Sequence, residues 1–379
     1  MKYLLMIPGP VEISDDILEA FQGQTVAHYG QEFRDLYVGT TKKLSKILGS
    51  KGKSFLIPGS GSTSLETIAA TFCSSKKCLI LNNGFFGDRL YDIVSKYTFA
   101  IENKKFSLGE TINLNDVRQI LEAKKFDIVL MTHVDTSVGI LNPIREVASI
   151  AKEHGALFFV DAIASSGIEM LQMDKWDISA VVTATQKGFG CPPGLGMVTV
   201  QESLLNNFVN QSPKSWYLDL RTWVDYYKKW NSWHPYPVTL PTNLIKALAR
   251  SLDTIESIGI AKRVKMFEEV SMRLRKSLKA LGLELFVPEG FYSHGLTSVH
   301  TIGKFNSADL VLFLKKKLKI QIAGSLGSLQ NVVFRIGHMS EKQCQNRNLI
   351  AVIGGIGLYM NSIGLKASID EAISELIEY

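Results

Sequence analysis

The sequence contains few cysteines, and their spacing does not suit a metal site. Cys73, Cys78, Cys191 and Cys344 are the only four in 379 residues, and they match no metal-ligand pattern. Cysteines scattered in this way, in a chain without an export signal, are expected to be reduced thiols. The sequence therefore predicts no metal centre.

Long hydrophobic runs are also missing. No apolar stretch approaches the roughly 18 to 20 residues that a bilayer-spanning helix needs. The short apolar stretch Tyr3 to Ile7 is followed at once by Pro8-Gly9-Pro10, which makes it too short for a secretory signal. We therefore expect no membrane span, and a protein of the cytoplasm.

Charge of one sign is not concentrated enough to indicate a nucleic-acid partner. The formal net charge is +6, and its densest run is Lys315-Lys316-Lys317-Leu318-Lys319. This run lies in a helical pattern, where a solvated helix face is favoured over a nucleic-acid site. Internal repeats and low-complexity tracts are absent as well, so a globular protein is expected.

From about residue 50 to 200, short apolar runs alternate with amphipathic stretches. Continuous hydrophobicity in a run predicts a strand that is covered on both faces. The predicted strands are Ser54–Ile57, Cys78–Leu81, Ile128–Thr132, Leu157–Val160, Ala180–Ala184 and Met197–Val200. Strands that alternate with helices indicate a mostly parallel α/β sheet.

The helix predicted between the third and fourth of these strands has a sequence signal at each end. Asn142 is the predicted N-cap, Pro143 the first helical residue and Gly155 the residue past the end. A much longer helical stretch is predicted from Thr242 towards Ala280, with a break near Gly259.

The C-terminal third differs in pattern from the sheet region. Strands predicted near Thr297–Thr301 and Val332–Ile336 indicate a smaller α+β unit. The chain is also longer than one ordinary core supports. We expect an N-terminal arm over residues 1–15, a large domain over 16–243 and a small domain over 244–379.

Three polar features follow predicted strands, at the edge where open α/β sheets bind ligands. The first is the turn Pro58-Gly59-Ser60-Gly61-Ser62-Thr63, which precedes a helix. Its free amides, its hydroxyls and the helix N-terminus could hold an anion. The turn matches neither a Walker A loop nor the GxGxxG fingerprint, and an ordinary tight turn is the alternative.

The second feature is Asp161, directly after four apolar strand residues. A carboxylate in this position needs a partner or solvent. It could cap the helix that begins near Ile163, or it could face a cationic heterocycle such as a protonated pyridine.

The third feature is Lys187 in Thr185-Gln186-Lys187-Gly188-Phe189-Gly190, just past a predicted strand. Most lysines lie on the surface, and Lys187 could be one of them. A desolvated lysine would instead have a lowered pKa and could form an imine as a nucleophile.

Taken together, the three features resemble one family. Asp161 precedes Lys187 by 26 residues, downstream of the glycine-rich turn. The chain resembles the class V aminotransferases, close to the alanine–glyoxylate and serine–pyruvate group, over nearly its whole length. The motifs that carry the resemblance are Pro8-Gly9-Pro10, Gly59-Ser60-Gly61-Ser62, Asn83-Gly84-Phe85-Phe86-Gly87, Val160-Asp161, Thr185-Gln186-Lys187-Gly188, Pro192-Pro193-Gly194 and Phe334-Arg335-Ile336-Gly337.

This resemblance implies a fold-type I enzyme that depends on pyridoxal 5′-phosphate. Its large domain would hold a mostly parallel sheet, and its smaller C-terminal domain would be α+β. Around the cofactor it implies phosphate ligands, a stacking aromatic ring, a partner for the pyridine nitrogen and a Schiff-base lysine. The implied cofactor residues are Ser60, Gly61, Ser62, Phe86, Ser137, Asp161, Ile163, Gln186 and Lys187. For Phe86, a core position in a turn is the alternative.

The resemblance also implies how the reaction runs. Lys187 would hold the cofactor aldehyde and then serve as the general base at the substrate's α-carbon, which gives ping-pong kinetics. Arg335 would clamp the substrate carboxylate, since a guanidinium pairs with it bidentately; an ordinary salt bridge is the alternative. Gly9 would approach the substrate through its backbone.

A homodimer with active sites at the subunit interface is implied too. Relatives donate a Tyr and a Thr to the phosphate of the neighbouring subunit, and Tyr236 and Thr239 match this pair. Leu240 and Thr242 depart from the family pattern, so a proline-rich connector remains the alternative.

The expected function is transamination between alanine or serine and glyoxylate or pyruvate. Aspartate and 2-aminoethylphosphonate remain alternative donors. A cysteine desulfurase of the same fold is a rival, although desulfurases stack a His where Phe86 stands and need a mobile Cys, whereas Cys191 is expected to be packed. A cofactor-free α/β binding protein is the rival from another class.

Overall fold

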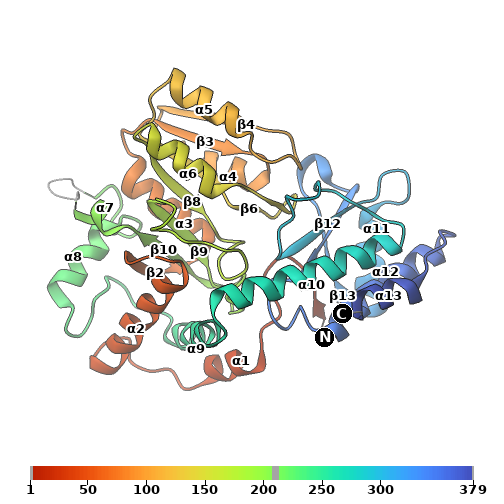
Figure 1. Cartoon of the computed structure of the whole chain (residues 1–379). Helices are drawn as coiled ribbons and strands as arrows, with labels where there is room; N and C mark the ends of the chain where they lie inside the picture. Colours follow the sequence, from red (N-terminus) through yellow and green to blue (C-terminus); the bar gives the residue numbers. More distant parts are fainter. Residues whose placement is uncertain (1–2, 207–212, 378–379) are drawn as a thin grey trace.

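The computed structural model describes residues 3–206 and 213–377. Its centre is a seven-stranded sheet with the strand order β2-β10-β9-β8-β5-β3-β4 (Figure 1). Every neighbouring pair from β9 to β4 is parallel, whereas β10 is antiparallel to both β9 and β2. The strands are β2 Lys53–Gly59, β3 Cys78–Asn82, β4 Ile101–Lys105, β5 Ile128–Thr132, β8 Leu157–Asp161, β9 Ala180–Ala184 and β10 Gly194–Val200.

The predicted mostly parallel sheet is therefore confirmed, and all six predicted strands are present. The seventh, β4, is an edge strand that pairs only with β3, and its residues are polar and only partly buried. An edge strand needs no continuous apolar run, which is why the sequence pattern did not predict it.

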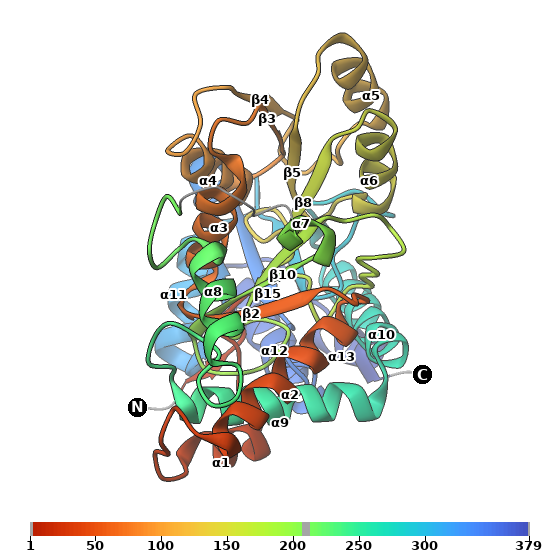
Figure 2. The ribbon, with the colours of Figure 1, turned by 90° about the vertical axis from the view of Figure 1, so that its left-hand side faces the viewer.

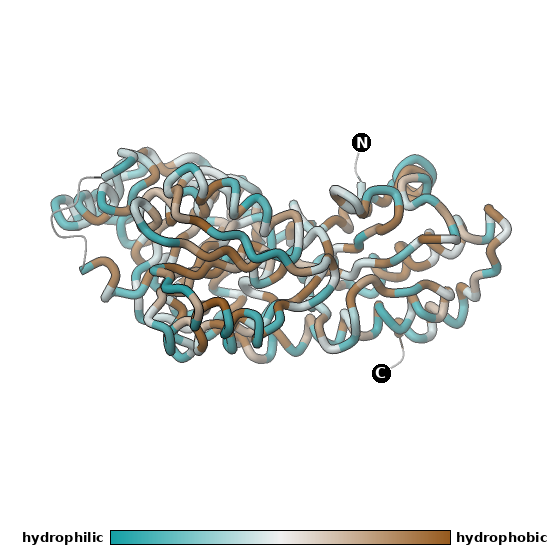
Figure 3. The backbone as a smooth tube through the Cα atoms, turned by 90° about the horizontal axis from the view of Figure 1, so that it is seen from above, coloured by the Kyte–Doolittle hydropathy of each residue, from teal (hydrophilic) through white to brown (hydrophobic). Residues whose placement is uncertain are grey.

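Besides the short π-helix Ala69–Cys73, eight α-helices precede residue 242 among the described residues. They are α1 Asp15–Gln22, α2 Gln31–Ile47, α3 Gly61–Ile68, α4 Phe85–Val94, α5 Leu114–Ala123, α6 Ile144–Glu153, α7 Glu202–Asn206 and α8 Leu220–Trp230. Figure 2 shows α1 and α2 beside α9 (Thr242–Ile258) near β2, with α5 and α6 near the other end of the sheet. Hydrophobic segments gather in the interior, with hydrophilic segments around them (Figure 3).

The start of α6 corrects the predicted cap. The helix begins at Ile144, and Pro143 rather than Asn142 occupies the N-cap position. The Asn142 side chain bonds Asn83 and the Thr132 carbonyl instead, so it fastens the loop to the sheet. The other end agrees with the prediction, because Gly155 lies just past the helix with φ +71°.

The break in the long helix is confirmed at Gly259, whose φ is +83°. It separates α9 from α10 (Ile260–Ala280). The apolar face of α9 belongs to the core of the large sheet, and Phe267 and Leu274 of α10 belong to the second core. In Figure 1, α10 runs from the large sheet to the smaller C-terminal unit.

The second core lies around a four-stranded antiparallel sheet with the order β11-β12-β15-β14. The remaining elements around it are β11 Glu284–Leu285, β12 Leu296–His300, α11 Ser307–Phe313, β13 Ile320–Gln321, β14 Ala323–Gly324, β15 Val333–Gly337, α12 Asn346–Ser362 and α13 Ile369–Ile377. The strand β1 (Leu4–Leu5) pairs in parallel with β13, so these two residues join the C-terminal unit. Among the described helices, none is long and apolar enough to cross a bilayer.

The topology brings the chemistry-bearing loops to one edge. Strands β5, β8 and β9 are parallel neighbours, and Thr132 at the end of β5 pairs with Asp161 at the end of β8. Lys187 follows three residues after the end of β9 at Ala184. The carboxyl ends of these strands therefore deliver their polar residues to the same place.

Candidate active site

A cavity of about 280 Å³ lies at this edge of the sheet. It brings together eight of the predicted site residues, which are Ser60, Gly61, Ser62, Phe86, Asp161, Ile163, Gln186 and Lys187. The residues that complete its lining are Leu65, Arg89, Thr132, Val134, Thr136 and Ala164. Five separate segments of the chain thus meet around one space.

One wall of the cavity is the N-terminus of α3. The Ser60 N–H donates to Thr63 Oγ1 at 3.0 Å, and the Thr63 N–H donates to the Ser60 carbonyl at 2.9 Å. Among the described residues, no acceptor takes the N–H groups of Gly61 and Ser62. A helix N-terminus with free amides attracts an anion. Gly61 also fits tightly, because a Cβ there would lie 2.6 Å from Ile163 Cδ1.

Asp161 also lines the cavity and is 4% exposed. Its Oδ1 accepts the Ile163 N–H at 3.0 Å, whereas no donor among the described residues reaches Oδ2. Burial raises the pKa of this carboxyl to about 7; Ile163's hydrogen bond lowers it and nearby Asp135 raises it further. The predicted helix near Ile163 is not present, so Asp161 caps a turn there instead, and its role toward a cationic heterocycle stays a prediction.

Lys187 projects into the same cavity from the loop after β9. Burial lowers the pKa of its amine to about 8, and the positive charge of Arg335 contributes. Its Nζ donates to the Pro8 carbonyl. The N-terminal turn lies directly on the lysine, because a Cβ on Gly9 (φ +89°) would be 2.6 Å from Lys187 Cδ. A lysine with this pKa has a substantial uncharged fraction just above neutral pH, as a nucleophile requires.

Phe86 lines the cavity near the start of α4, held there by a residue that the sequence did not single out. The buried Asp135 carboxylate accepts the N–H groups of Phe86 (2.9 Å), Gly87 (3.1 Å) and Ser137 (2.9 Å). The Ser137 hydroxyl donates to the same carboxylate at 2.5 Å and accepts the Phe85 N–H at 3.0 Å. Ser137 therefore supports the loop that carries Phe86 and does not itself line the cavity. An acidic residue in the loop directly after the buried strand β5 was the available signal.

Replacing Asp135 by alanine is expected to lower the free energy of unfolding by about 2–4 kcal/mol, because three buried N–H donors lose their acceptor. Urea unfolding of the cofactor-free protein measures this value. Asp92→Ala, at an exposed position of α4, is the control and should change this free energy by less than about 0.5 kcal/mol. Equal stability of the two variants would show that Asp135 does not hold the Phe86 loop.

The other predicted residues lie outside the cavity lining. Arg335, on β15, is 7% exposed; its Nε and Nη2 donate to the Gly324 carbonyl at 2.9 and 2.6 Å, and its Nη1 donates to the Thr136 carbonyl. Burial lowers the pKa of its guanidinium to about 10, which still leaves it charged at neutral pH. It pairs with no carboxylate among the described residues, so the ordinary salt bridge is not observed.

Tyr236 and Thr239 lie beside His28 of the same protomer. Tyr236 is fully buried and its hydroxyl donates to the His28 carbonyl, whereas Thr239 Oγ1 lies 3.4 Å from His28 Nε2. Neither residue lines the cavity of its own chain.

Two buried polar atoms without a hydrogen-bond partner indicate what kind of ligand this cavity could hold. Gln186 Oε1 and Thr132 Oγ1 are buried without a hydrogen-bond partner, although both residues line the cavity. Buried polar atoms are normally paired. A polar ligand with an anionic group near Gly61, a basic ring nitrogen near Asp161 and an aldehyde near Lys187 would satisfy this lining. Pyridoxal 5′-phosphate has these groups.

The fold and this set of groups define a fold-type I enzyme that depends on pyridoxal phosphate. The chain belongs to the class-V aminotransferase family, whose sequence model matches residues 15–337. It is therefore a PLP-dependent aminotransferase, as the motifs predicted, and the cofactor-free binding protein is excluded.

Known proteins resemble the chain along its whole length. An uncharacterized aminotransferase of Methanocaldococcus jannaschii is 31% identical over 97% of this chain and 94% of its own length. Alanine–glyoxylate aminotransferase 1 of Saccharomyces cerevisiae is 28% identical over 91% of this chain and 94% of its own. The crystal structure of ureidoglycine–glyoxylate aminotransferase from Bacillus subtilis superposes with a TM-score of 0.92 at 25% identity, covering 100% of this chain and 97% of that one.

Proposed function

We propose that this enzyme moves an amino group between alanine or serine and glyoxylate or pyruvate, with Lys187 as the residue that bonds to the cofactor aldehyde. One observation carries the proposal: the buried Lys187 amine shares a cavity with the Asp161 carboxylate and with the free amides at the start of α3. An amine, a carboxylate and an anion cradle are the three groups that the cofactor requires.

Each lining residue has a task toward the cofactor. The amides and hydroxyls of Ser60, Gly61 and Ser62, with the Gln186 amide, would hold the phosphate. Asp161 Oδ2 would accept a hydrogen bond from the protonated ring nitrogen and keep it protonated. When bound, pyridoxal phosphate supplies an electron sink for the pair of electrons left at the substrate's α-carbon. Phe86 and Ile163 would cover the two faces of the ring and keep it in one orientation.

Lys187 has a second task in the transfer. Its neutral Nζ would act as the general base that takes the proton from the substrate's α-carbon and holds it for return later in the transfer. The lowered pKa of Lys187 supports this role. Amino-acid donor and oxo-acid acceptor would then use the same site in turn, with ping-pong kinetics.

Arg335 would pair with the substrate carboxylate. A guanidinium carries five N–H donors. Donation to the Gly324 and Thr136 carbonyls uses three of them, so two remain for a carboxylate. Gly9 would shape the same end of the cavity from above Lys187.

A homodimer is part of the proposal, because Tyr236 and Thr239 would complete the phosphate site of a neighbouring subunit. Both lie outside the cavity of their own chain. An exposed aromatic cluster close by supports a protein partner here. Its members Tyr29, Trp230 and Trp233 are 40–54% exposed. The ring centroid of Trp233 lies 6.2 Å from that of Tyr29 and 6.0 Å from that of Trp230. Contiguous exposed aromatic side chains favour an interface. Light scattering should give twice the mass of one chain.

Glyoxylate is favoured as one acceptor because the names of two of the similar aminotransferases reported above include it. A desulfurase activity is disfavoured by the cysteines, all four of which are buried. Burial raises the pKa of both Cys191 and Cys344 to about 12, so neither thiol is available as a nucleophile near neutral pH.

A donor screen tests the proposal. Purified protein loaded with pyridoxal phosphate should be yellow, lose the colour when alanine or serine is added, and regain it with glyoxylate or pyruvate. Double-reciprocal plots should be parallel. Decolouration by aspartate or 2-aminoethylphosphonate, but not by alanine or serine, would replace the proposed donors; sulfide release from cysteine would replace the reaction class.

A further inference from the structure

We propose that Arg263, on α10, is the positioning residue that holds the Lys187 loop against the loop after Asp161. Arg263 is 3% exposed. Its Nη2 donates to the Gly188 carbonyl at 2.9 Å, and its Nε donates to the Gly167 carbonyl at 2.7 Å. Gly188 directly follows Lys187. This inference rests on the proposed role of Lys187.

The two carbonyls have no alternative donor. In the part of the chain that the structure describes, Arg263 is the one group that donates to either of them. A buried carbonyl without a donor costs free energy, and two carbonyl dipoles that converge on the same point repel each other. The planar fork of Arg263 removes both costs at once, and only a fork with fixed geometry bonds two acceptors along one edge.

The loops that Arg263 joins are in direct contact. A Cβ on Gly188 would lie 2.2 Å from the Ser166 carbonyl oxygen, and a Cβ on Gly167 would lie 3.2 Å from the Gly188 carbonyl oxygen. The separation between the Lys187 loop and the Asp161 loop is therefore fixed by backbone atoms. Arg263 holds these backbone atoms together from the side away from the cavity.

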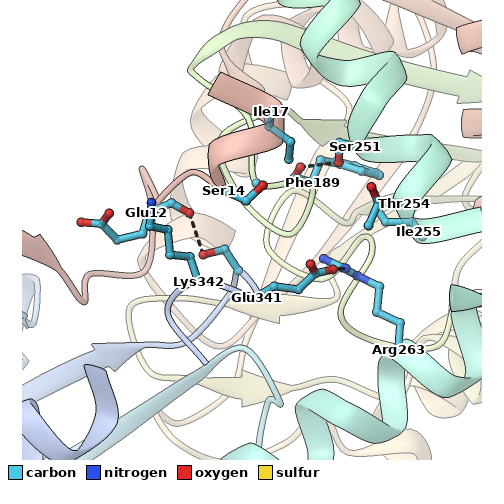
Figure 4. A pocket seen from close by; sticks show the side chains of 12 residues that line it. Glu12, Ser14, Ile17, Phe189, Ser251, Thr254, Ile255, Arg263, Glu341 and Lys342 are labelled. Carbon is cyan, nitrogen blue, oxygen red and sulfur yellow. Dashed lines mark hydrogen bonds and ion pairs between the residues drawn. The ribbon is translucent and has the colours of Figure 1, made fainter. Parts of the chain in front are cut away.

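The third guanidinium nitrogen of Arg263 contacts the segment after β15. Its Nη1 pairs with Glu341, six residues beyond Arg335 (Figure 4). One guanidinium thus connects the segments that carry Lys187, Asp161 and Arg335. Figure 4 also shows Ser251 of α9 bonded to the Phe189 carbonyl, which fixes the next residue of the lysine loop.

The space beside Arg263 is too small for a ligand. It has a volume of about 20 Å³, which is about the space for one water molecule. Arg263 is therefore not an anion-binding residue, although a buried guanidinium elsewhere in a protein often is. Its role is to set the position of Lys187 relative to Asp161.

The test compares Arg263→Met with Arg275→Met in the loaded enzyme. Arg275 is a matched control: it lies on the same helix, is 8% exposed and donates to the Ser293 carbonyl, away from the lysine loop. For Arg263→Met we expect kcat to fall on the order of a hundredfold, as a misplaced catalytic group would cause. The KM for the amino donor should change by less than about twofold, because the carboxylate site is intact.

Two further readouts separate positioning from a general loss of stability. The circular dichroism of the bound cofactor should weaken in Arg263→Met and not in Arg275→Met, and the dissociation constant of pyridoxal phosphate should rise about tenfold only in the former. Arg263→Lys should recover part of kcat, because its ammonium reaches one carbonyl but not both. If Arg263→Met does not fold, Arg263→Lys carries the comparison.

Unchanged kcat and cofactor circular dichroism in both Arg263 variants would overturn the inference. Equal losses in the Arg263 and Arg275 variants would overturn it as well, since they would indicate a merely structural role. Failure of the wild-type protein to form a yellow, borohydride-sensitive complex would instead overturn the proposed function, so the two failures are distinct.

Discussion

Lys187→Ala is expected to remove the yellow colour of the loaded enzyme and to lower kcat by roughly ten-thousandfold or more. The variant loses both the bond to the cofactor aldehyde and the base that moves the substrate's proton. Among the described residues, Lys187 is the one lysine that lines the cavity, so no second amine can take its place. Absorbance spectra and single-turnover rates with alanine and glyoxylate measure the two losses.

The control is Lys175→Ala, at an exposed position, which should retain wild-type colour and kcat. Borohydride reduction followed by peptide mass analysis should find the cofactor on the peptide that contains Lys187. Cofactor on another peptide, or colour retained by Lys187→Ala, would contradict the assignment of Lys187.

Asp161→Asn is expected to have opposite effects on activity and on the stability of the cofactor-free protein. Activity should fall on the order of a thousandfold, because an amide cannot keep the ring nitrogen protonated. The free energy of unfolding should rise, because burial raises the pKa of Asp161 from an ordinary value to about 7. A folded-state carboxyl with a raised pKa prefers to be protonated, so its ionisation destabilises the fold.

The pH dependence follows from this sign. Ionisation of Asp161 should lower the stability of the cofactor-free protein as pH rises from about 4 to about 7, and this loss should be complete above that range. A shift of about three pKa units corresponds to at most about 4 kcal/mol, which Asp161→Asn should recover above pH 7 and not at pH 4. Urea unfolding at both pH values measures the difference.

Asp225→Asn, at an exposed position on α8, is the control for this experiment and should show the wild-type pH dependence. An Asp161→Asn protein that is less stable than wild type at pH 8 would show that the cap to Ile163 outweighs the cost of the buried charge. Full activity in this variant would remove Asp161 from the proposed mechanism.

Local patterns predicted most of the fold. The runs that became β3, β5, β8 and β9 are continuous apolar segments, because strands covered on both faces require them. The break in the long helix could be predicted because only glycine readily adopts the positive φ of Gly259. The motif residues Asp161 and Lys187 follow strands, so a parallel sheet necessarily brings them to one edge.

Other features of the fold and the site depend on contacts between residues far apart in the sequence, which a local pattern does not predict. The direction of β10 is set by its pairing with β2 and β9, and an antiparallel strand has the same apolar run as a parallel one. Asp135 and Arg263 are single polar residues whose acceptors or donors lie on distant segments. Tyr236 and Thr239 match a family motif, yet one chain alone does not bring them to a cavity, so their role stays a prediction.

The position of the N-terminal residues affects when the cofactor site can form during synthesis of the chain. Strand β1 pairs with β13 near residue 320, and the turn that follows β1 rests on Lys187. Leu4 to Pro10 can therefore reach their final position only after β13, more than three hundred residues later in the chain, has been synthesised. We therefore expect a nascent chain to retain the cofactor tightly only after β13 has been synthesised.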